Sequence, residues 1–110
     1  RLPNPDRAVI DAAKLRDYLL STAHPVGRFK AHFFASLGYS AENWEQLDTD
    51  IRDLIAAAEA HPRVKTEYGQ KYEVRGSLTG PGGRRAEIVT VWIILAGEEV
   101  PRFVTAYTGS

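Results

Sequence analysis

Two glycine-containing loops divide the last third of the chain into three stretches of strand-forming residues. The first loop reads Gly-Pro-Gly-Gly at positions 80–83, and the second reads Gly-Glu-Glu-Val at positions 97–100. Short loops of this composition between such stretches are typical of β-hairpins. We therefore predict an antiparallel β-meander with strands at about 68–79, 84–96 and 101–107.

The register of this meander decides which side chains share a face. With symmetric closure of both loops, Glu73 lies opposite Thr90 and Trp92 lies opposite Thr105. Because side chains alternate along a strand, one face carries a polar and aromatic set: Lys71, Glu73, Arg75, Thr90, Trp92, Thr105 and Tyr107. The other face carries an apolar set that suits a core: Tyr72, Val74, Val89, Val91, Ile93, Leu95 and Val104. A one-residue bulge would exchange the faces beyond it.

The predicted polar face has two interpretations. Antiparallel sheets often keep one face in water, and such a face needs no function. An exposed Trp92 among Thr, Lys, Glu, Arg and Tyr instead offers stacking, acid and base groups and anion contacts in one place. A merely solvated face would more often carry Lys, Glu and Thr without an indole, so the choice of residues favours function.

The residues before the sheet predict helices. Asp11 is a suitable N-cap for a first helix that ends before Ser21. Pro25 disfavours helical geometry at the preceding residue, which places His24 in a connection. This histidine therefore lies outside the helices.

Two further helices are predicted downstream. Apolar residues at helical spacing indicate a helix over 27–37, which Gly38 ends in a left-handed conformation. Ser40 can cap a third helix that runs to about residue 60 and is closed by His61 and the proline after it.

Together these elements predict an α+β fold, with three N-terminal helices packed on one face of a C-terminal antiparallel β-meander. The chain of 110 residues suits one domain. Residues 1–10 contain two prolines and are predicted to be an arm or linker. Residues 11–110 form the domain, with a helical part at about 11–61 and a sheet part at about 66–108.

Composition excludes several classes of site. The chain has no cysteine, so it has neither disulfides nor a thiolate zinc site, and its three histidines lack the spacing of metal ligands. No metal and no cofactor is predicted. No apolar run is long enough to cross a membrane. The formal net charge is zero, with a small basic excess in the sheet half that is compatible with contact to RNA.

The remaining polar residues suggest acid–base chemistry without a protein nucleophile. No nucleophile motif, paired carboxylates or strand-to-helix phosphate loop is present. Cleavage of RNA suits such a set, because the 2′-hydroxyl of the substrate attacks the neighbouring phosphate. His24 is the candidate acid or base, and Arg28 and Lys30 could bind the phosphate if their helix end reaches the sheet. The alternatives are a loop histidine that caps or packs, and a solvated helix side.

Several motifs connect the chain to known families. They are His24-Pro25 through Lys30-Ala31 to Phe34, Leu37-Gly38, Tyr68-Gly69-Gln70-Lys71-Tyr72, Thr79-Gly80-Pro81-Gly82-Gly83-Arg84, Val91-Trp92-Ile93-Ile94 and Pro101-Arg102-Phe103-Val104-Thr105-Ala106-Tyr107. With these motifs the chain resembles a bacterial domain family of unknown function. Members look like small stand-alone proteins or C-terminal modules, some beside a small gene of the kind found in toxin–antitoxin pairs.

A second resemblance concerns the order of helices followed by an antiparallel sheet. It is similar to the superfamily of barnase, EndoU, colicin and RelE nucleases. The segment Thr90-Val91-Trp92 looks like the Ser-x-Trp strand of its colicin-type tRNA nucleases, and His24 with Lys30 looks like their Lys/His cluster. This resemblance implies RNA or tRNA as a partner, a cognate antitoxin or immunity protein, and, for a toxin domain, action as a soluble protein in the bacterial cytoplasm.

The leading hypothesis is a small ribonuclease-like toxin domain that cleaves RNA by metal-independent transesterification. The predicted catalytic residues are His24, Lys30, Glu73, Thr90 and Tyr107, and the predicted substrate-binding residues are Arg28, Lys71, Arg75, Trp92 and Thr105. Glu73 is the second proton-transfer group in this scheme, and Trp92 or Tyr107 stacks on a base. The alternative is a non-catalytic interaction module of the immunity or adaptor type that docks through the same face. Only the nuclease needs His24 or Glu73 within hydrogen-bond reach of the Thr90/Tyr107 face.

Overall fold

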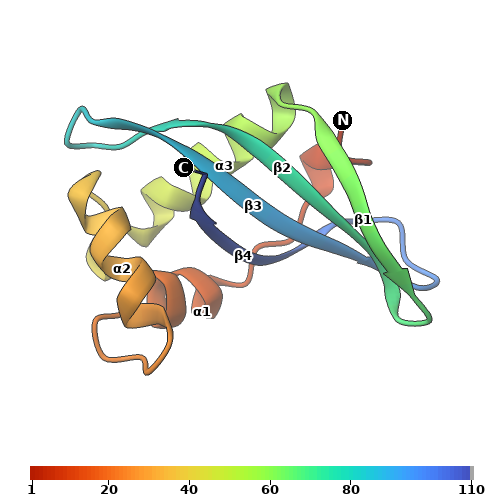
Figure 1. Cartoon of the computed structure of the whole chain (residues 1–110), viewed down its shortest axis with the longest axis horizontal. Coiled ribbons are helices and arrows are strands. Elements are labelled where there is room, and N and C mark those ends of the chain that lie inside the picture. The colour runs from red at the N-terminus through yellow and green to blue at the C-terminus, as the bar shows by residue number, and fades with distance from the viewer. Residues whose placement is uncertain (110) are drawn as a thin grey trace.

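Four antiparallel strands follow one another in a single sheet, in the order β1-β2-β3-β4 (Figure 1). The computed structural model describes residues 1–109. The strands are β1 (Ala60–Thr66), β2 (Gly69–Thr79), β3 (Arg85–Leu95) and β4 (Arg102–Thr108). The predicted meander is confirmed, and β1 extends it by a strand that was not predicted.

The helical elements precede the sheet, as predicted. They are the turn η1 (Pro5–Arg7), helix α1 (Ala12–Lys14), the π-helical turn η2 (Leu15–Leu19), helix α2 (Gly27–Ser36), the turn η3 (Ala41–Asn43) and helix α3 (Trp44–Ala57). The Asp11 side chain accepts a hydrogen bond from the amide of Ala13, which confirms the predicted cap. The third helix ends at Ala57, so the prediction that His61 closes it is wrong. Because β1 is an edge strand, it tolerates the proline that follows His61.

The helices and the sheet form two layers. Helix α3 packs against β2, whereas α1 and α2 lie together beside β4 (Figure 1). Between the layers lies a core of fully buried side chains, which include Leu15, Leu19, Phe34, Leu47, Ile51, Ile55, Val74, Ile88 and Trp92. The predicted fold class is therefore confirmed.

The register of the sheet differs from the predicted one by one residue. Tyr72 lies opposite Trp92, and Val74 lies opposite Thr90. The reason is the first loop: Thr79 pairs with Arg85, so the loop has an odd number of residues and every side chain beyond it changes face. A second irregularity, between Val91 and Trp92, shifts the pairing with β4.

This shift places the predicted open-face tryptophan in the core. Trp92 has no exposed surface, its Nε1 donates to the Thr90 hydroxyl at 2.8 Å, and that hydroxyl donates to the Val74 carbonyl at 3.1 Å. The interpretation of Thr90 and Trp92 as surface residues is therefore wrong. Buried polar groups need such partners, and this pair satisfies them internally.

The face of the sheet away from the helices keeps the other predicted polar residues. Glu73 on β2, Val91 on β3 and Thr105 on β4 lie directly opposite one another and so share this face. Lys71, Arg75 and Tyr107 lie on the same face, with Val89, Val91 and Ile93 of β3 between them in place of Thr90 and Trp92. No helix covers it in Figure 1, and we call it the open face.

Residues 1–10, for which an arm or linker was predicted, are packed on the domain. Leu2 is only 1% exposed. The amide of Val9 donates to the carbonyl of Pro101 at 2.8 Å, and the amide of Phe103 donates to the carbonyl of Val9 at 2.9 Å. The segment, which we call the arm, therefore lies along the outer edge of β4.

The glycine-rich loop after β2 is a hairpin turn, as predicted, and it docks on the end of α2. The amide of Gly82 donates to the carbonyl of Leu37 at 3.1 Å. Gly38 has a left-handed φ of 99°, and a Cβ there would lie 2.5 Å from the amide nitrogen of Gly82. A Cβ on Gly80 would collide with the Leu37 carbonyl oxygen. The backbone of the loop and the backbone at the end of α2 approach so closely that only glycine fits at positions 38 and 80.

We expect Gly80→Ala to lower the free energy of unfolding by about 2 kcal/mol, because the methyl group forces the turn away from α2. Urea denaturation followed by circular dichroism measures this change. Gly83→Ala is the matched control, because a Cβ at Gly83 meets no atom within 4 Å. Its left-handed φ of 86° leaves a backbone cost of about 1 kcal/mol. Equal losses in the two variants would show that the docking contact contributes nothing.

Candidate functional site

A pocket of about 470 Å³ opens where the helical layer meets the last strand. It is lined by Ala13, Lys14, Tyr18, His24, Val104 and Thr105. These residues come from α1, η2, the connection before α2, and β4. We call this hollow the edge pocket, because β4 is the edge strand of the sheet.

His24 caps α2 with its ring. Its Nδ1 accepts hydrogen bonds from the amides of Val26 and Gly27, both at 3.0 Å. The amide of His24 is itself held by the Ser21 hydroxyl at 3.2 Å. The capping interpretation of this histidine is therefore confirmed. A ring whose Nδ1 accepts carries its proton on Nε2, so in this state His24 presents a donor rather than a base to the pocket.

Tyr18 lies against His24 and comes from the π-helical turn. The two rings meet edge to face, with centroids 5.0 Å apart. The amide of Leu20 bonds to the carbonyl of Leu15, which widens the turn by one residue and changes the direction of the side chains along it. Such π-turns occur often at functional sites.

Lys30 links α2 to the sheet. Its Nζ donates to the Thr105 hydroxyl at 2.8 Å and lies 5.4 Å from the centroid of the Tyr18 ring. The first turns of α2 therefore do reach the sheet, which was the condition for assigning Lys30 to a site. The ammonium group of Lys30 is therefore bonded to the Thr105 hydroxyl and also lies against the aromatic ring of Tyr18.

The charges around Tyr18 change the acidity of its hydroxyl. Burial acts to raise the pKa of Tyr18, but the interactions of the hydroxyl with Lys30 and Thr105 and the charges of Lys30 and Lys14 outweigh burial. The pKa of Tyr18 therefore lies below its usual value. A hydroxyl of this kind gives up its proton more readily than an ordinary tyrosine.

Sequence reasoning missed Tyr18 and Lys14. Tyr18 falls within the segment predicted as the first helix, between Asp11 and Ser21. Its polar role depends on Lys30 and Thr105, which are distant in sequence. No local signal marks it, apart from its position shortly before the His-Pro pair that starts the α2 motif.

Only part of the predicted site is brought together. Lys30 is joined to Thr105 by a hydrogen bond, and Thr105 lines the edge pocket together with His24. Glu73 faces Arg63 of β1, with 3.1 Å between its Oε1 and the arginine Nε, and lies two strands away from Thr105, about 10 Å across the sheet.

The other predicted residues lie elsewhere. Arg28 stacks on the exposed ring of Phe29, with its Cζ 4.9 Å from the ring centroid. Arg75 donates to the carbonyl of Gly109 at 2.6 Å, while Lys71 and Tyr107 lie on the open face. Thr90 and Trp92 are in the core.

Within residues 1–109, no group of three or more His, Cys, Asp or Glu side chains is placed to hold a metal ion. In the same range, no helix has the length and apolarity needed to cross a membrane.

The fold and the edge pocket define a small α+β domain in which a pocket opens beside the last strand of an antiparallel sheet. The chain belongs to the family described as the domain of unknown function DUF6883, whose sequence model matches residues 1–110. This confirms that it is a member of a domain family of unknown function.

Among solved structures, the chain is similar to a chain of a contact-dependent growth inhibition toxin–immunity protein complex from Klebsiella pneumoniae 342. The match has a TM-score of 0.68 and 18% sequence identity, and it covers 90% of this chain and 97% of that one. At this identity the likeness shows a shared fold. No curated protein sequence matches the chain.

Proposed function

We propose that this chain is a small ribonuclease-like domain of the toxin type that cleaves RNA at the edge pocket by metal-independent transesterification. The observation that carries the proposal is the position of Lys30, whose ammonium group bonds to Thr105 and lies beside a Tyr18 hydroxyl of lowered pKa. The fold shared with a chain of a toxin–immunity complex supports a place in such a pair of proteins.

Each polar residue at the edge pocket has a separate role in the proposed transesterification. Ionised Tyr18 takes the proton of the 2′-hydroxyl, whose oxygen attacks the adjacent phosphorus. Lys30 and Lys14 stabilise the negative charge of the phosphorane, and the Nε2–H of His24 donates to one of its oxygens. The bond from phosphorus to the 5′-oxygen then breaks, and that oxygen receives the proton that Tyr18 had taken up, which leaves Tyr18 ionised again. The products are a 2′,3′-cyclic phosphate and a 5′-hydroxyl end.

Two assignments change relative to the expectation from sequence. Tyr18 takes the proton-transfer role that was predicted for Glu73, which lies outside the pocket. His24 acts as cap and donor in place of acid or base, because its Nδ1 is occupied by two amides. Lys71, Arg75 and Tyr107 remain candidates for contact with the RNA strand where it continues over the open face.

The experiment that tests this function is incubation of the purified chain with total RNA and with tRNA in EDTA. Discrete fragments that end in cyclic phosphate are expected. Intact RNA at all enzyme concentrations would reject the proposal.

His24→Asn separates the two roles of the histidine, because an asparagine oxygen can still cap α2 while the Nε2–H is lost. If His24→Asn cleaves RNA at the wild-type rate, His24 only caps α2 and does not donate to the phosphorane.

The lowered pKa of Tyr18 predicts a pH dependence. A base must be ionised, so the cleavage rate should rise with pH through the pKa of Tyr18, which lies below the ordinary 10.0. NMR titration of tyrosines labelled at Cζ measures this pKa without an activity assay. We expect Tyr18 to titrate below the usual pKa of a tyrosine, and Lys30→Met to move its midpoint to higher pH. An unchanged midpoint in Lys30→Met would contradict the assigned cause.

A second candidate function is a non-catalytic interaction module of the immunity or adaptor type. It is favoured by an exposed apolar pair at the start of α2, where Val26 is 57% and Phe29 is 70% exposed. Large apolar side chains at this exposure are typical of binding surfaces. Intact RNA in the cleavage experiment would make this the leading candidate.

A further inference from the structure

One edge of the sheet is left without a neighbouring strand. Strand β1 pairs with β2 only as far as Val74, the partner of Ala60. Within the range that the structure describes, no strand lies beside β2 from Gly76 to Thr79 on that side. We call these residues the β2 edge.

The backbone of the β2 edge presents hydrogen-bonding groups outward. The amide of Gly80 bonds to the carbonyl of Arg84, and the amide of Ala96 bonds to the carbonyl of Tyr68, at the two ends of the β2–β3 ladder. Because ladder bonds alternate, even-numbered residues of β2 bond to β3 and odd-numbered ones point away from it. Ser77 and Thr79 therefore direct their N–H groups outward.

The other two edges of the sheet are protected. The outer edge of β4 is covered by the arm through Val9. The outer edge of β1 carries a proline, Pro62, and the charged side chains of Arg63 and Lys65. Proteins use such devices to prevent unwanted strand pairing. The β2 edge has no strand beside it in the described part of the chain and no proline or lysine, so it differs from both. Its Thr79 carbonyl accepts a hydrogen bond from the Tyr39 hydroxyl at 3.5 Å, which leaves the N–H groups of Ser77 and Thr79 available.

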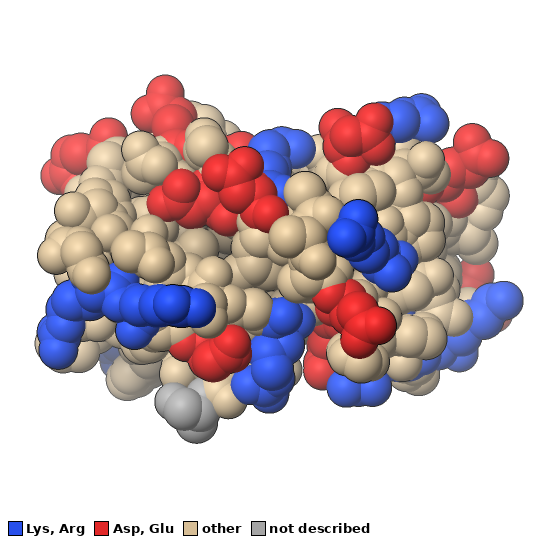
Figure 2. Space-filling view, turned by 90° about the horizontal axis from the view of Figure 1, so that it is seen from above, with Lys and Arg blue, Asp and Glu red and all other residues tan. Residues whose placement is uncertain are grey.

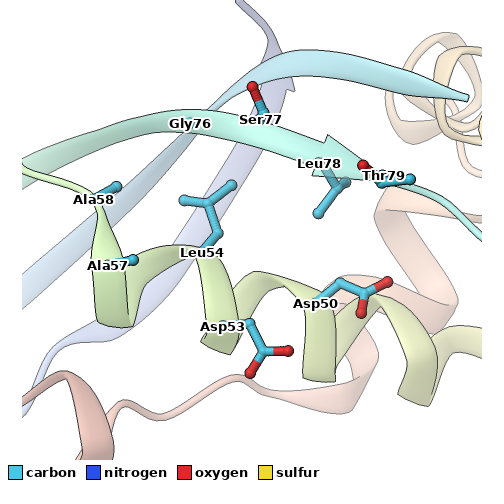
Figure 3. Close-up of a pocket in the computed structure, with 9 residues that line it drawn as sticks. All are labelled: Asp50, Asp53, Leu54, Ala57, Ala58, Gly76, Ser77, Leu78 and Thr79. Atoms are coloured by element: carbon cyan, nitrogen blue, oxygen red, sulfur yellow. The ribbon is translucent and has the colours of Figure 1, made fainter.

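A groove lies beside this edge. Its volume is about 420 Å³, and α3 forms its other wall (Figure 3). Leu54 and Leu78 project between helix and strand, and Ala57 adds a small apolar surface (Figure 3). A strand added to the β2 edge would lie along this groove and could place an apolar side chain on it.

The rim of the groove is acidic. Asp50 and Asp53 line it from α3, and Asp53 has no hydrogen bond or ion pair with any described residue. Asp50 is held by the Tyr39 hydroxyl at 2.6 Å and by Gln46 at 3.0 Å. Elsewhere on the face shown in Figure 2, acidic and basic groups are interspersed. An unpaired carboxylate beside an open strand edge favours a basic occupant.

We propose that the β2 edge is a docking site for an extended basic segment of a partner protein, which adds to the sheet as a further strand beside Gly76–Thr79. The partner backbone would bond to the N–H groups of Ser77 and Thr79, and a lysine or arginine would meet Asp53. A second copy of this chain does not suit the site, because it would bring two acidic α3 rims together. This docking site does not depend on the proposed ribonuclease activity.

The test uses the whole chain and peptides of known sequence. Random peptides of strand length, displayed on phage, are selected on the immobilised protein, and an enriched peptide is titrated into the ¹⁵N-labelled chain. Enriched sequences should alternate and contain lysine or arginine. The Ser77 and Thr79 amides should shift and become protected from hydrogen exchange. Absence of enrichment, or shifts confined to other elements, would overturn the proposal.

Three variants make the test specific. Ser77→Pro removes one outward N–H without touching the ladder to β3, and Asp53→Lys reverses the charge of the rim. Each should weaken peptide binding about tenfold, whereas Ser77→Ala keeps the N–H and should bind within about twofold of wild type. If Ser77→Pro does not fold, the peptide affinity of Asp53→Lys decides whether the proposal stands. Unchanged affinity in Asp53→Lys, or a dimer of the free chain closed by this edge, would overturn the proposal.

Discussion

Trp92→Ala is expected to lower the free energy of unfolding by about 3–5 kcal/mol. The indole has no exposed surface and packs edge to face on Phe103, with ring centroids 5.3 Å apart. Its removal leaves a cavity between sheet and helices, and it also removes the donor that bonds to the Thr90 hydroxyl. Urea denaturation followed by far-ultraviolet circular dichroism measures the change.

Tyr68→Ala is the matched control for this loss, because Tyr68 is also a large aromatic residue next to the sheet but is 71% exposed. We expect it to change stability by less than about 0.5 kcal/mol. A loss below about 1 kcal/mol in Trp92→Ala would contradict the buried position and support the symmetric register instead.

Tyr18→Phe and Lys30→Met are each expected to reduce RNA cleavage by about 10²–10⁴-fold. The first removes the hydroxyl that exchanges protons with the substrate. The second removes the ammonium group that lowers the pKa of that hydroxyl and stabilises the phosphorane. Initial rates on a labelled oligoribonucleotide in EDTA measure both effects.

Matched controls come from β1 and the turn that follows it. Lys65→Met and Tyr68→Phe make the same chemical changes at exposed positions away from the edge pocket, and both should cleave at the wild-type rate. Thermal melting distinguishes catalysis from folding, because the pocket variants should melt close to the wild-type temperature. Full activity in Tyr18→Phe would reject the mechanism while leaving the fold intact.

The fold could be predicted from sequence because its signals are local. Loop composition marks the β2–β3 hairpin, and Asp11 and Gly38 mark helix ends. The register could not be predicted in the same way. It depends on whether the first loop contains an even or an odd number of residues, and on an irregularity at Val91. Neither is visible in an alternating pattern, and each reverses the face of everything beyond it.

The site was predictable only where the residues lie in a recognisable motif. His24 and Lys30 belong to such a motif; His24 lines the pocket, and Lys30 bonds to Thr105, which also lines it. Thr105 was also predicted as a site residue, but on a sheet face that was expected to carry Thr90 and Trp92, which lie in the core instead. Tyr18 could not be found, because its importance comes from contact with Lys30 and Thr105, which the folded chain brings to it.

The arm has a consequence for the order in which the chain folds. The meander forms from hairpins between neighbouring segments, whereas the side-chain bond of Asn4 to the carbonyl of Glu99 joins residues 95 positions apart. Closing such a long loop is slow, so we expect the hairpins to form early and the arm to dock last. In the interval, Phe103 and the rest of the β4 edge lack their cover. Docking of the arm is therefore expected to end the period in which the folding chain exposes the β4 edge to strand pairing with other chains.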